Sequence, residues 1–352
     1  MAESWFELNT ADQSEALEIA SAQTGRPAHL LEKDIWIVWV LSAIYNSHLS
    51  EHLTFKGGTS LSKVYKIIDR FSEDIDLTYD IRALVPDLLH QGNPIPVSPS
   101  QEKKISNTVK SRLPLWIQSE VIPIIEAALQ QSKLDASLSM AGKENEKLII
   151  SYPALKTGTG YAQTSIQLEF GARATGEPND FHNISCDIEA AIPGIIFPTA
   201  RPLAMKAERT FWEKATAAHV FCRQGRLRGD RYARHWYDLA AIAKTPYYDL
   251  AIQDRQLAEK VAEHKTLFFS EKDTEGTRID YHLAVNGKIQ LVPEGDSLEA
   301  LKQDYAAMLE DGLLALHQPR FSELMAACKV IEKRIMKICN SHILRTIHEP
   351  FF

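Results

Sequence analysis

The chain has 352 residues, of which 45% are hydrophobic and 24% are charged, and its formal net charge at pH 7 is −7. This composition fits a globular protein long enough for two domains, and the negative charge argues against a protein that coats nucleic acid, although a local basic patch is compatible with it. The chain has no long apolar run and no basic, apolar N-terminus, so no membrane span or secretory signal is expected. Its four cysteines lack CxxC spacing, which suggests reduced thiols in the cytoplasm and no zinc site.

The first 48 residues are expected to form a helical segment. Residues 30–40, with the sequence LLEKDIWIVWV, are strongly apolar and predict its second helix. They include the charged string Glu32-Lys33-Asp34, which a network of charges on that helix would explain.

A glycine turn followed by two aspartates is the most informative part of the chain. Residues 53–55 predict a short strand. Gly57 and Gly58 then open a segment whose apolar residues have the spacing of one helix face, namely Leu61, Val64, Tyr65 and Ile68. Residues 74–77 have the sequence DIDL, so Asp74 and Asp76 are expected to share one face of a half-buried strand.

Two carboxylates on one strand face repel each other, so their burial requires a cation. Carboxylate oxygens suit Mg²⁺, which commonly also binds phosphate oxygens. The turn at Gly57 and Gly58 supplies backbone N–H groups at a helix N-terminus, which form an anion site. A metal site beside a phosphate site indicates phosphoryl or nucleotidyl transfer.

The strings GGTSLSK (57–63) and RFSEDIDL (70–77) resemble known enzymes. The turn followed by an acidic strand is similar to the polymerase-beta-like nucleotidyltransferase superfamily, and these two strings resemble its AbiEii/AbiGii family of toxin nucleotidyltransferases. The gap between Gly58 and Asp74 is longer than in the wider superfamily, which we interpret as about one further helical turn.

Several residues near the turn are expected to bind nucleotide phosphates. The turn contributes Lys56, Gly57, Gly58, Thr59 and Ser60. Arg70 and Ser72 flank the acidic strand and are further candidates, although Ser72 equally suits a turn cap.

A third metal ligand is expected from another strand. Residues 148–152 and 164–170 predict strands, and they follow a long helix over 102–131 that Pro114 and Pro123 kink or split. Glu169 lies on the polar face of the second strand, and the string EFGAR (169–173) resembles a segment of the family. We therefore expect Glu169 to complete a metal triad with Asp74 and Asp76.

Asp187 and Glu189 repeat the pattern of an acid, an apolar residue and an acid. No glycine turn and helix precede them. We therefore interpret this pair as a solvated strand edge, and a metal-binding role in competition with Glu169 is the alternative.

Two segments of the C-terminal half resemble family stretches. In residues 207–219, Lys214 lies on the side of a predicted helix that should pack inward, where a lysine reaches solvent or meets an anion. Residues 234–239 have the sequence RHWYDL. The resemblance implies that Lys214 binds the nucleoside triphosphate and that Asp238 helps to organise the site. The structural alternatives are a Glu–Lys pair within one helix and an acid that caps a helix.

Five arginines lie within twelve residues of this otherwise acidic chain, at positions 223, 226, 228, 231 and 234. They form either a solvated charged face or a phosphate-binding rim for an RNA end or nucleotide. Arg234, next to the Tyr237-Asp238 pair, is the arginine that we expect to act in the site.

The predicted fold class is α+β. A small mixed-sheet nucleotidyltransferase core over residues 49–200 follows the N-terminal helical segment of residues 1–48. A C-terminal helical domain over residues 201–352 is expected to line the cleft. Beyond about residue 203 the chain is predicted to be mostly helical.

The resulting hypothesis is an enzyme that transfers a nucleoside monophosphate from an NTP to a hydroxyl group with release of pyrophosphate, assisted by two Mg²⁺ ions. The resemblance implies a toxin of a toxin-antitoxin or phage abortive-infection system, with a separately encoded antitoxin and an RNA acceptor such as the 3′ end of tRNA. Two alternatives stay open: transfer to a protein hydroxyl or a small molecule, and a nucleotide-binding module without catalysis.

Overall fold

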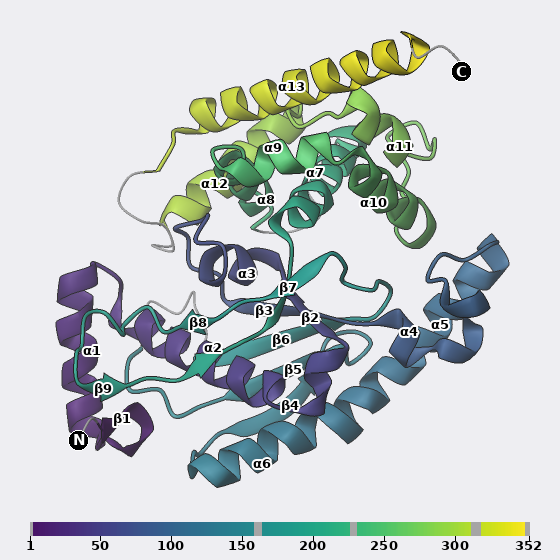
Figure 1. Cartoon of the computed structure of the whole chain (residues 1–352). Coiled ribbons are helices and arrows are strands. Elements are labelled where there is room, and N and C mark those ends of the chain that lie inside the picture. The colour runs from purple at the N-terminus through teal and green to yellow at the C-terminus, as the bar shows by residue number, and fades with distance from the viewer. Residues whose placement is uncertain (1–2, 158–163, 226–230, 311–317, 349–352) are drawn as a thin grey trace. The chain divides into compact units, whose positions relative to one another are not determined.

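The computed structural model describes residues 3–157, 164–225, 231–310 and 318–348 (Figure 1). The chain divides into two compact units. The first comprises Met1–Lys66 and Phe71–Met205, and the second comprises Ile67–Arg70 and Lys206–Phe352. Across the described ranges, no helix is both long and apolar enough to cross a membrane.

A mixed sheet lies at the centre of the first unit (Figure 1). Within the described residues its seven strands have the order β4-β5-β6-β3-β2-β11-β7. Their bounds are β2 Leu53–Lys56, β3 Asp74–Tyr79, β4 Ser137–Ala141, β5 Lys147–Ser151, β6 Ser165–Gly171, β7 Asn179–Phe181 and β11 Leu203–Met205. The central strand β3 runs parallel to β6 and antiparallel to β2. The predicted α+β class and the strands predicted around residues 54, 75, 150 and 167 are confirmed.

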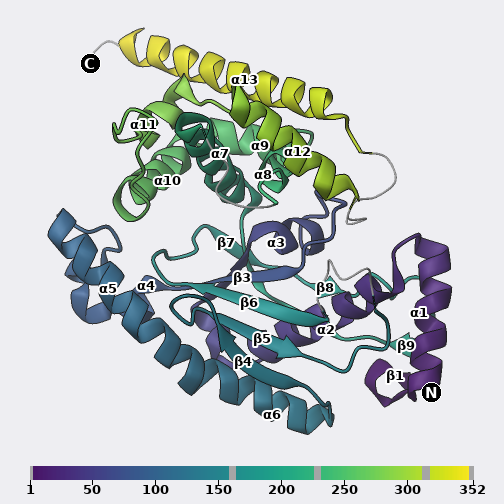
Figure 2. The same cartoon turned by 180° about the vertical axis from the view of Figure 1, so that it is seen from behind.

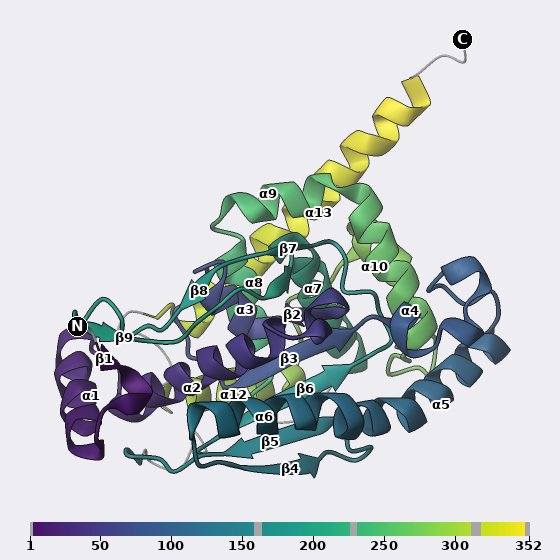
Figure 3. The same cartoon turned by 60° about the horizontal axis from the view of Figure 1, so that its bottom comes forward.

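One face of this sheet is apolar and covered by helices. Ile75 and Leu77 of β3 and Leu168 of β6 are buried on this face. The helices α2 (Ala28–Tyr45), α5 (Pro99–Trp116) and α6 (Ile122–Ser132) lie along it (Figure 3). Trp116 of α5 packs edge-on against Phe170 of β6, with ring centroids 5.8 Å apart. The polar residues that alternate with these apolar residues therefore face away from the three helices.

The predicted long helix is confirmed, and its prolines shape it without ending it. Pro114 lies inside α5, and a π-helical turn at Ile117–Val121 joins α5 to α6. Pro123 lies in the first turn of α6. Because proline lacks an N–H group and its ring crowds the preceding turn, a wider turn beside it accommodates the lost hydrogen bond.

The N-terminal segment is helical, as predicted. The helix α1 (Thr10–Thr24) begins at Asn9, whose side chain accepts hydrogen bonds from two backbone N–H groups, and it ends at Gly25. Further short elements of this unit are β1 Glu3–Ser4, α4 Ile81–Leu84, β8 Ile184–Ser185, β9 Ile195–Ile196 and β10 Thr199–Ala200. Of these, β1 pairs with β9 and β8 pairs with β10.

The helix predicted after the glycine turn is shorter than expected. The helix α3 spans Gly57–Lys63, so the additional helical turn predicted before Asp74 is wrong. The chain leaves the helix at Val64, and Lys66 adopts a positive φ of 53°. Side chains at both ends of the loop are held by ion pairs, Lys63 with Asp34 and Arg70 with Asp238. These long-range contacts outweigh the helical spacing of the apolar residues.

The second unit is helical, as predicted beyond residue 203 (Figure 2). Its helices are α7 Ala207–Gln224, α8 Arg234–Ile242, α9 Pro246–Gln253, α10 Arg255–Phe268, α11 Tyr281–Leu283, α12 Asp296–Glu310 and α13 Phe321–His348. Two buried tryptophans form hydrogen bonds between different segments of this unit. The indole N–H of Trp212 donates to the carbonyl of Ala251, and that of Trp236 donates to the carbonyl of Leu291.

Candidate functional site

Three carboxylates lie on the sheet face that points away from the covering helices. Asp74 and Asp76 are two residues apart on β3 and therefore share a face, as predicted. Glu169 on the parallel strand β6 is the register partner of Asp76. Register partners on neighbouring strands point to the same side of a sheet. The backbone thus brings the three predicted metal ligands together on one face.

Each end of this acidic group has a polar neighbour on an adjacent strand. The side-chain amide of Gln167 donates to Oδ1 of Asp74 at 3.1 Å. Nζ of Lys147 on β5 lies 2.8 Å from Oε2 of Glu169. Burial opposes protonation of Lys147, but its bond to Glu169 and the charges of Glu169 and Asp74 together raise the pKa of this lysine.

Sequence reasoning missed Lys147. It is the register partner of Glu169 in the antiparallel pair β5–β6. The signal lies in the strand sequence KLIIS, whose first residue occupies the polar face. Recognising its importance requires the pairing of β5 with β6, which one strand alone does not reveal.

The glycine turn lies directly against the acidic strand. Gly57 has a φ of +80°, and a Cβ atom at this position would lie 2.8 Å from Cγ of Asp76. A side chain would therefore be strained by the backbone and would overlap the carboxylate. Lys56, just before the turn, is the register partner of Asp76 on β2.

Thr59 and Ser60 are buried, and their hydroxyl groups bond to the backbone. The hydroxyl of Thr59 donates to the carbonyls of Asp74 at 2.5 Å and Ser72 at 3.3 Å, and that of Ser60 donates to the carbonyl of Gly57 at 3.0 Å. Ser72 is itself buried. These contacts hold the turn on β3, and any phosphate contact from this turn would come from its backbone N–H groups.

The donor chemistry of the acidic face suits a hard divalent cation such as Mg²⁺, because all three ligands are carboxylates. In the part of the chain that the structure describes, no three His, Cys, Asp or Glu side chains gather closely enough to form a metal site. Glu169 is bonded to Lys147, so binding of a cation by all three carboxylates requires the Glu169 side chain to turn.

A second cluster lies within the second unit, around Asp238. This carboxylate is completely buried and accepts a hydrogen bond from Nε of Arg70 and another from Nη2, each at 2.7 Å. Nζ of Lys214 lies 2.9 Å from Oδ2 of Asp238. Burial would raise the pKa of Asp238, but the charges and hydrogen bonds of Arg70 and Lys214 outweigh it and hold this pKa well below 3.8.

The contacts of Lys214 and Asp238 contradict both structural alternatives, which were a Glu–Lys pair within one helix and an acid that caps a helix. Lys214 pairs with Asp238 on another helix, whereas the ion pair within α7 joins Arg209 to Glu213. Asp238 lies in the middle of α8 and caps no helix. Arg70, a predicted phosphate contact, is buried and forms an ion pair with Asp238.

The arginine run is described only in part. Arg226 and Arg228 lie outside the described residues. Nη2 of Arg223 lies 3.1 Å from Oδ2 of Asp273, and Arg234 is the first residue of α8. The phosphate-binding rim stays a prediction.

The side chains of the charged string of α2 contact three different segments, so the structural alternative, a network of charges confined to this helix, is wrong. The carboxylate of Glu32 accepts hydrogen bonds from the backbone N–H groups of residues 155 and 156. Lys33 lies 3.4 Å from Glu73, the residue before Asp74. Asp34 lies 2.7 Å from Lys63 of α3. The string thus anchors the segments around the acidic strand.

Asp187 is not the solvated strand edge that its pattern suggested. It lies in a turn after β8, and Nζ of Lys63 is 2.8 Å from its Oδ1. Arg26 also forms an ion pair with Asp187. The backbone N–H of Asp187 donates a hydrogen bond to Oδ2 of Asp34 at 2.7 Å. The isolated pattern could not reveal this because Lys63 is 124 residues away.

A family model matches most of this chain. The model of a family described as the nucleotidyl transferase AbiEii toxin of a type IV toxin-antitoxin system matches residues 39–327. No curated protein matches the sequence. Among solved structures, MenT4, a nucleotidyltransferase toxin from Mycobacterium tuberculosis H37Rv, is similar over 95% of this chain and 99% of its own, with 15% sequence identity and a TM-score of 0.39.

Proposed function

The chain belongs to the AbiEii family of nucleotidyltransferase toxins, and we propose that it transfers a nucleoside monophosphate from an NTP to a hydroxyl group of RNA. Pyrophosphate is the leaving group. The family description places its members in toxin-antitoxin systems, which supports a separately encoded antitoxin as partner. The proposed acceptor is the 3′ end of tRNA, and the five arginines between residues 223 and 234 support a polyanionic acceptor.

The observation that carries the proposal is the set of three carboxylates beside the glycine turn. Asp74, Asp76 and Glu169 would bind two Mg²⁺ ions. Bound Mg²⁺ would activate the attacking hydroxyl and stabilise the departing pyrophosphate. The residues themselves supply position and charge, which is most of what phosphoryl transfer requires of a protein.

The turn residues are the proposed contacts of the triphosphate. Gly57 has no side chain to block the approach to Asp76. The backbone N–H groups of Gly57, Gly58 and Thr59 lie in the first turn of α3, before the first intrahelical hydrogen bond, and would donate to phosphate. Lys56 adds positive charge beside Asp76, because the two residues are register partners.

In the second unit, Lys214 is the proposed nucleotide ligand and Asp238 positions it. The ion pair between them at 2.9 Å supports this assignment, since it fixes the direction of the lysine side chain. Because Arg70 binds both carboxylate oxygens of Asp238, it is better suited to hold Asp238 than to bind phosphate. Arg234 and Ser72 stay proposed contacts of the nucleotide.

The test is incubation of purified protein with Mg²⁺ and each α-³²P-labelled NTP in turn, with total cellular RNA and total protein in separate reactions. The expected result is label on RNA of tRNA size. The double variant Asp74→Ala/Asp76→Ala should lose it. A variant with Lys143→Met, an exposed lysine in the turn between β4 and β5, should retain it.

Label on protein would overturn the RNA acceptor and favour transfer to a protein hydroxyl. Bound nucleotide without label on any acceptor would favour a module that binds nucleotide without catalysis. Full labelling by Asp76→Ala would overturn the assignment of the acidic face.

A further inference from the structure

Four charged residues form a row across four neighbouring strands. Lys56 on β2 is paired in register with Asp76 on β3, Asp76 with Glu169 on β6, and Glu169 with Lys147 on β5. All four side chains therefore lie on the face away from the covering helices. The row has the order cation, acid, acid, cation.

The last two residues of this row, Glu169 and Lys147, form an ion pair that solvent can reach. Nζ of Lys147 lies 2.8 Å from Oε2 of Glu169. The Lys147 side chain is 27% exposed and that of Glu169 is 44% exposed, so water and small ions can reach both. An ion pair this exposed contributes little to stability and separates easily.

The ammonium group of Lys147 compensates charge where like charges crowd together. Asp74, Asp76 and Glu169 share one face, and without a cation their repulsion is unfavourable. A divalent cation would relieve the same repulsion with a larger charge. Lys147 and the cation thus offer alternative partners for the same carboxylate, and their positive charges repel each other.

We propose that Lys147 is a positioning residue that holds Glu169 in the metal-free protein and competes with the divalent cation for this carboxylate. The inference rests on the proposed function, because it takes Asp74, Asp76 and Glu169 as the cation's ligands. Lys147 then sets the cation concentration at which this face becomes occupied. When the cation enters, Glu169 turns to it and the bond to Lys147 is broken.

The experiment is a titration of the full-length, metal-free protein with Mn²⁺, in which electron paramagnetic resonance measures the free ion. Lys147→Met should bind Mn²⁺ about tenfold more tightly than the wild type, because a competing partner and a repelling charge are removed. Lys147→Arg keeps the charge and should stay close to the wild type. Lys143→Met removes the same charge from an exposed position outside the row and should also leave the affinity unchanged.

A second variant keeps the inference separate from a general charge effect. In a Glu169→Gln background, Lys147→Met should gain clearly less than tenfold, because the carboxylate for which they compete is gone. In the absence of metal, Lys147→Met should have nearly the melting temperature of the wild type, because so exposed an ion pair contributes little to stability. Saturating Mn²⁺ should raise the melting temperature more in Lys147→Met than in the wild type, because the variant binds the ion more tightly.

Equal or weaker Mn²⁺ binding by Lys147→Met would overturn the inference. If Asp74→Ala/Asp76→Ala still lost Mn²⁺ binding, the proposed metal site would stand. Absence of Mn²⁺ binding in the wild type would instead refute the metal site, and the inference with it.

Discussion

Gly57 and Asp76 occupy adjoining space, so the side chain of one depends on the absence of a side chain on the other. A Cβ atom on Gly57 would lie 2.8 Å from Cγ and 3.0 Å from Cβ of Asp76. The turn and the acidic strand are thus built as one unit of structure. Exchange of either residue is expected to disturb the other.

Gly57→Ala tests this relationship. The substitution should cost about 1–2 kcal/mol through the backbone alone, since φ is positive, and it should also displace the Asp76 carboxylate. A shift of this kind should reduce RNA labelling about 100-fold. Gly25→Ala is the matched control, because Gly25 also has a positive φ but no atom within 4 Å of an added Cβ. Urea unfolding and the labelling assay measure the two effects, and equal behaviour of both variants would contradict the close packing.

Mg²⁺ should stabilise the folded protein through the acidic face. A ligand at 100 times its Kd stabilises the state that binds it by about 2.7 kcal/mol. We expect this increase in the free energy of unfolding for the wild type and clearly less for Asp76→Asn. The same increase in Asp76→Asn would show that Mg²⁺ binds elsewhere.

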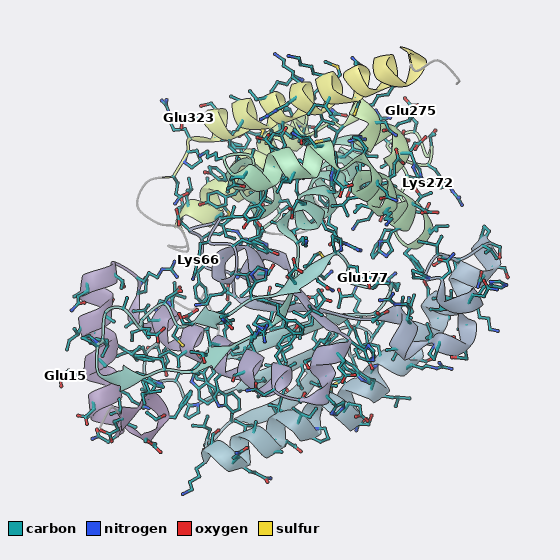
Figure 4. All side chains as sticks on the ribbon, in the orientation of Figure 1. Glu15, Lys66, Glu177, Lys272, Glu275 and Glu323 are labelled. Atoms are coloured by element: carbon teal, nitrogen blue, oxygen red, sulfur yellow. The ribbon has the colours of Figure 1, made fainter. Side chains whose placement is uncertain are left out.

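Lys63 should be required for stability, whereas Lys66 should not. Lys63 is buried between Asp34 and Asp187, so Lys63→Met leaves the fully buried Asp34 without its closest cation. Loss of one partner of a buried pair typically costs about 3–5 kcal/mol. Lys66 is 64% exposed (Figure 4) and lies 3.9 Å from Asp187, so Lys66→Met should change stability by less than about 0.5 kcal/mol. Similar values for both variants would contradict a special role of the buried lysine.

Asp238 should stabilise the fold down to low pH. Its pKa in the folded state lies well below 3.8, so the stabilisation is complete above the unfolded-state pKa and is lost as pH falls toward the folded-state pKa. The difference in unfolding free energy between wild type and Asp238→Asn should stay constant from pH 7 to 5 and be smaller by about 1 kcal/mol at pH 3. Urea unfolding at each pH measures it. A difference that already shrinks between pH 7 and 5 would contradict the strong pairing with Arg70 and Lys214.

His219 should make the protein less stable as the pH falls below 6.5. Burial, and secondly the charge of Arg223, lowers the pKa of His219 to about 4, and its Nδ1 accepts a hydrogen bond from the backbone N–H of Gln290 at 3.0 Å. The unfolded state therefore binds a proton that the folded state does not, between the two pKa values. Wild type should lose about 2 kcal/mol between pH 7 and 5 through this residue, and His219→Gln should lack that loss. His90 is exposed, so the control variant His90→Gln should show the same pH dependence of stability as the wild type. A His219→Gln variant that keeps the wild-type pH dependence would contradict the prediction.

Strands and helices with regular patterns could be predicted from the sequence. Residues 74–77 and 164–170 alternate between apolar and polar side chains, and this alternation alone indicates which face carries Asp74, Asp76 and Glu169. The apolar residues after Ser60 misled for a related reason. Their helical spacing is real, but Ile67–Arg70 belongs to the second unit, where Arg70 binds Asp238.

Partners far apart in the sequence could not be predicted. Asp34 and Lys63, Lys63 and Asp187, and Lys214 and Asp238 each contact through side chains on different elements. Their pairing depends on how the elements pack, and a single sequence carries no direct signal of it. Lys147 is a milder case, because its position on β5 was visible while the register with β6 was not.

The place of Arg70 has a consequence for anyone who wishes to produce the helical unit by itself. A fragment that starts at Lys206 contains Asp238 and Lys214 but lacks Arg70, which lies more than a hundred positions upstream. Such a fragment would enclose the Asp238 carboxylate with one cation instead of two. The second unit is therefore discontinuous along the chain. A fragment that reproduces it must contain residues 67–70, joined by a linker to the helices that begin after Lys206.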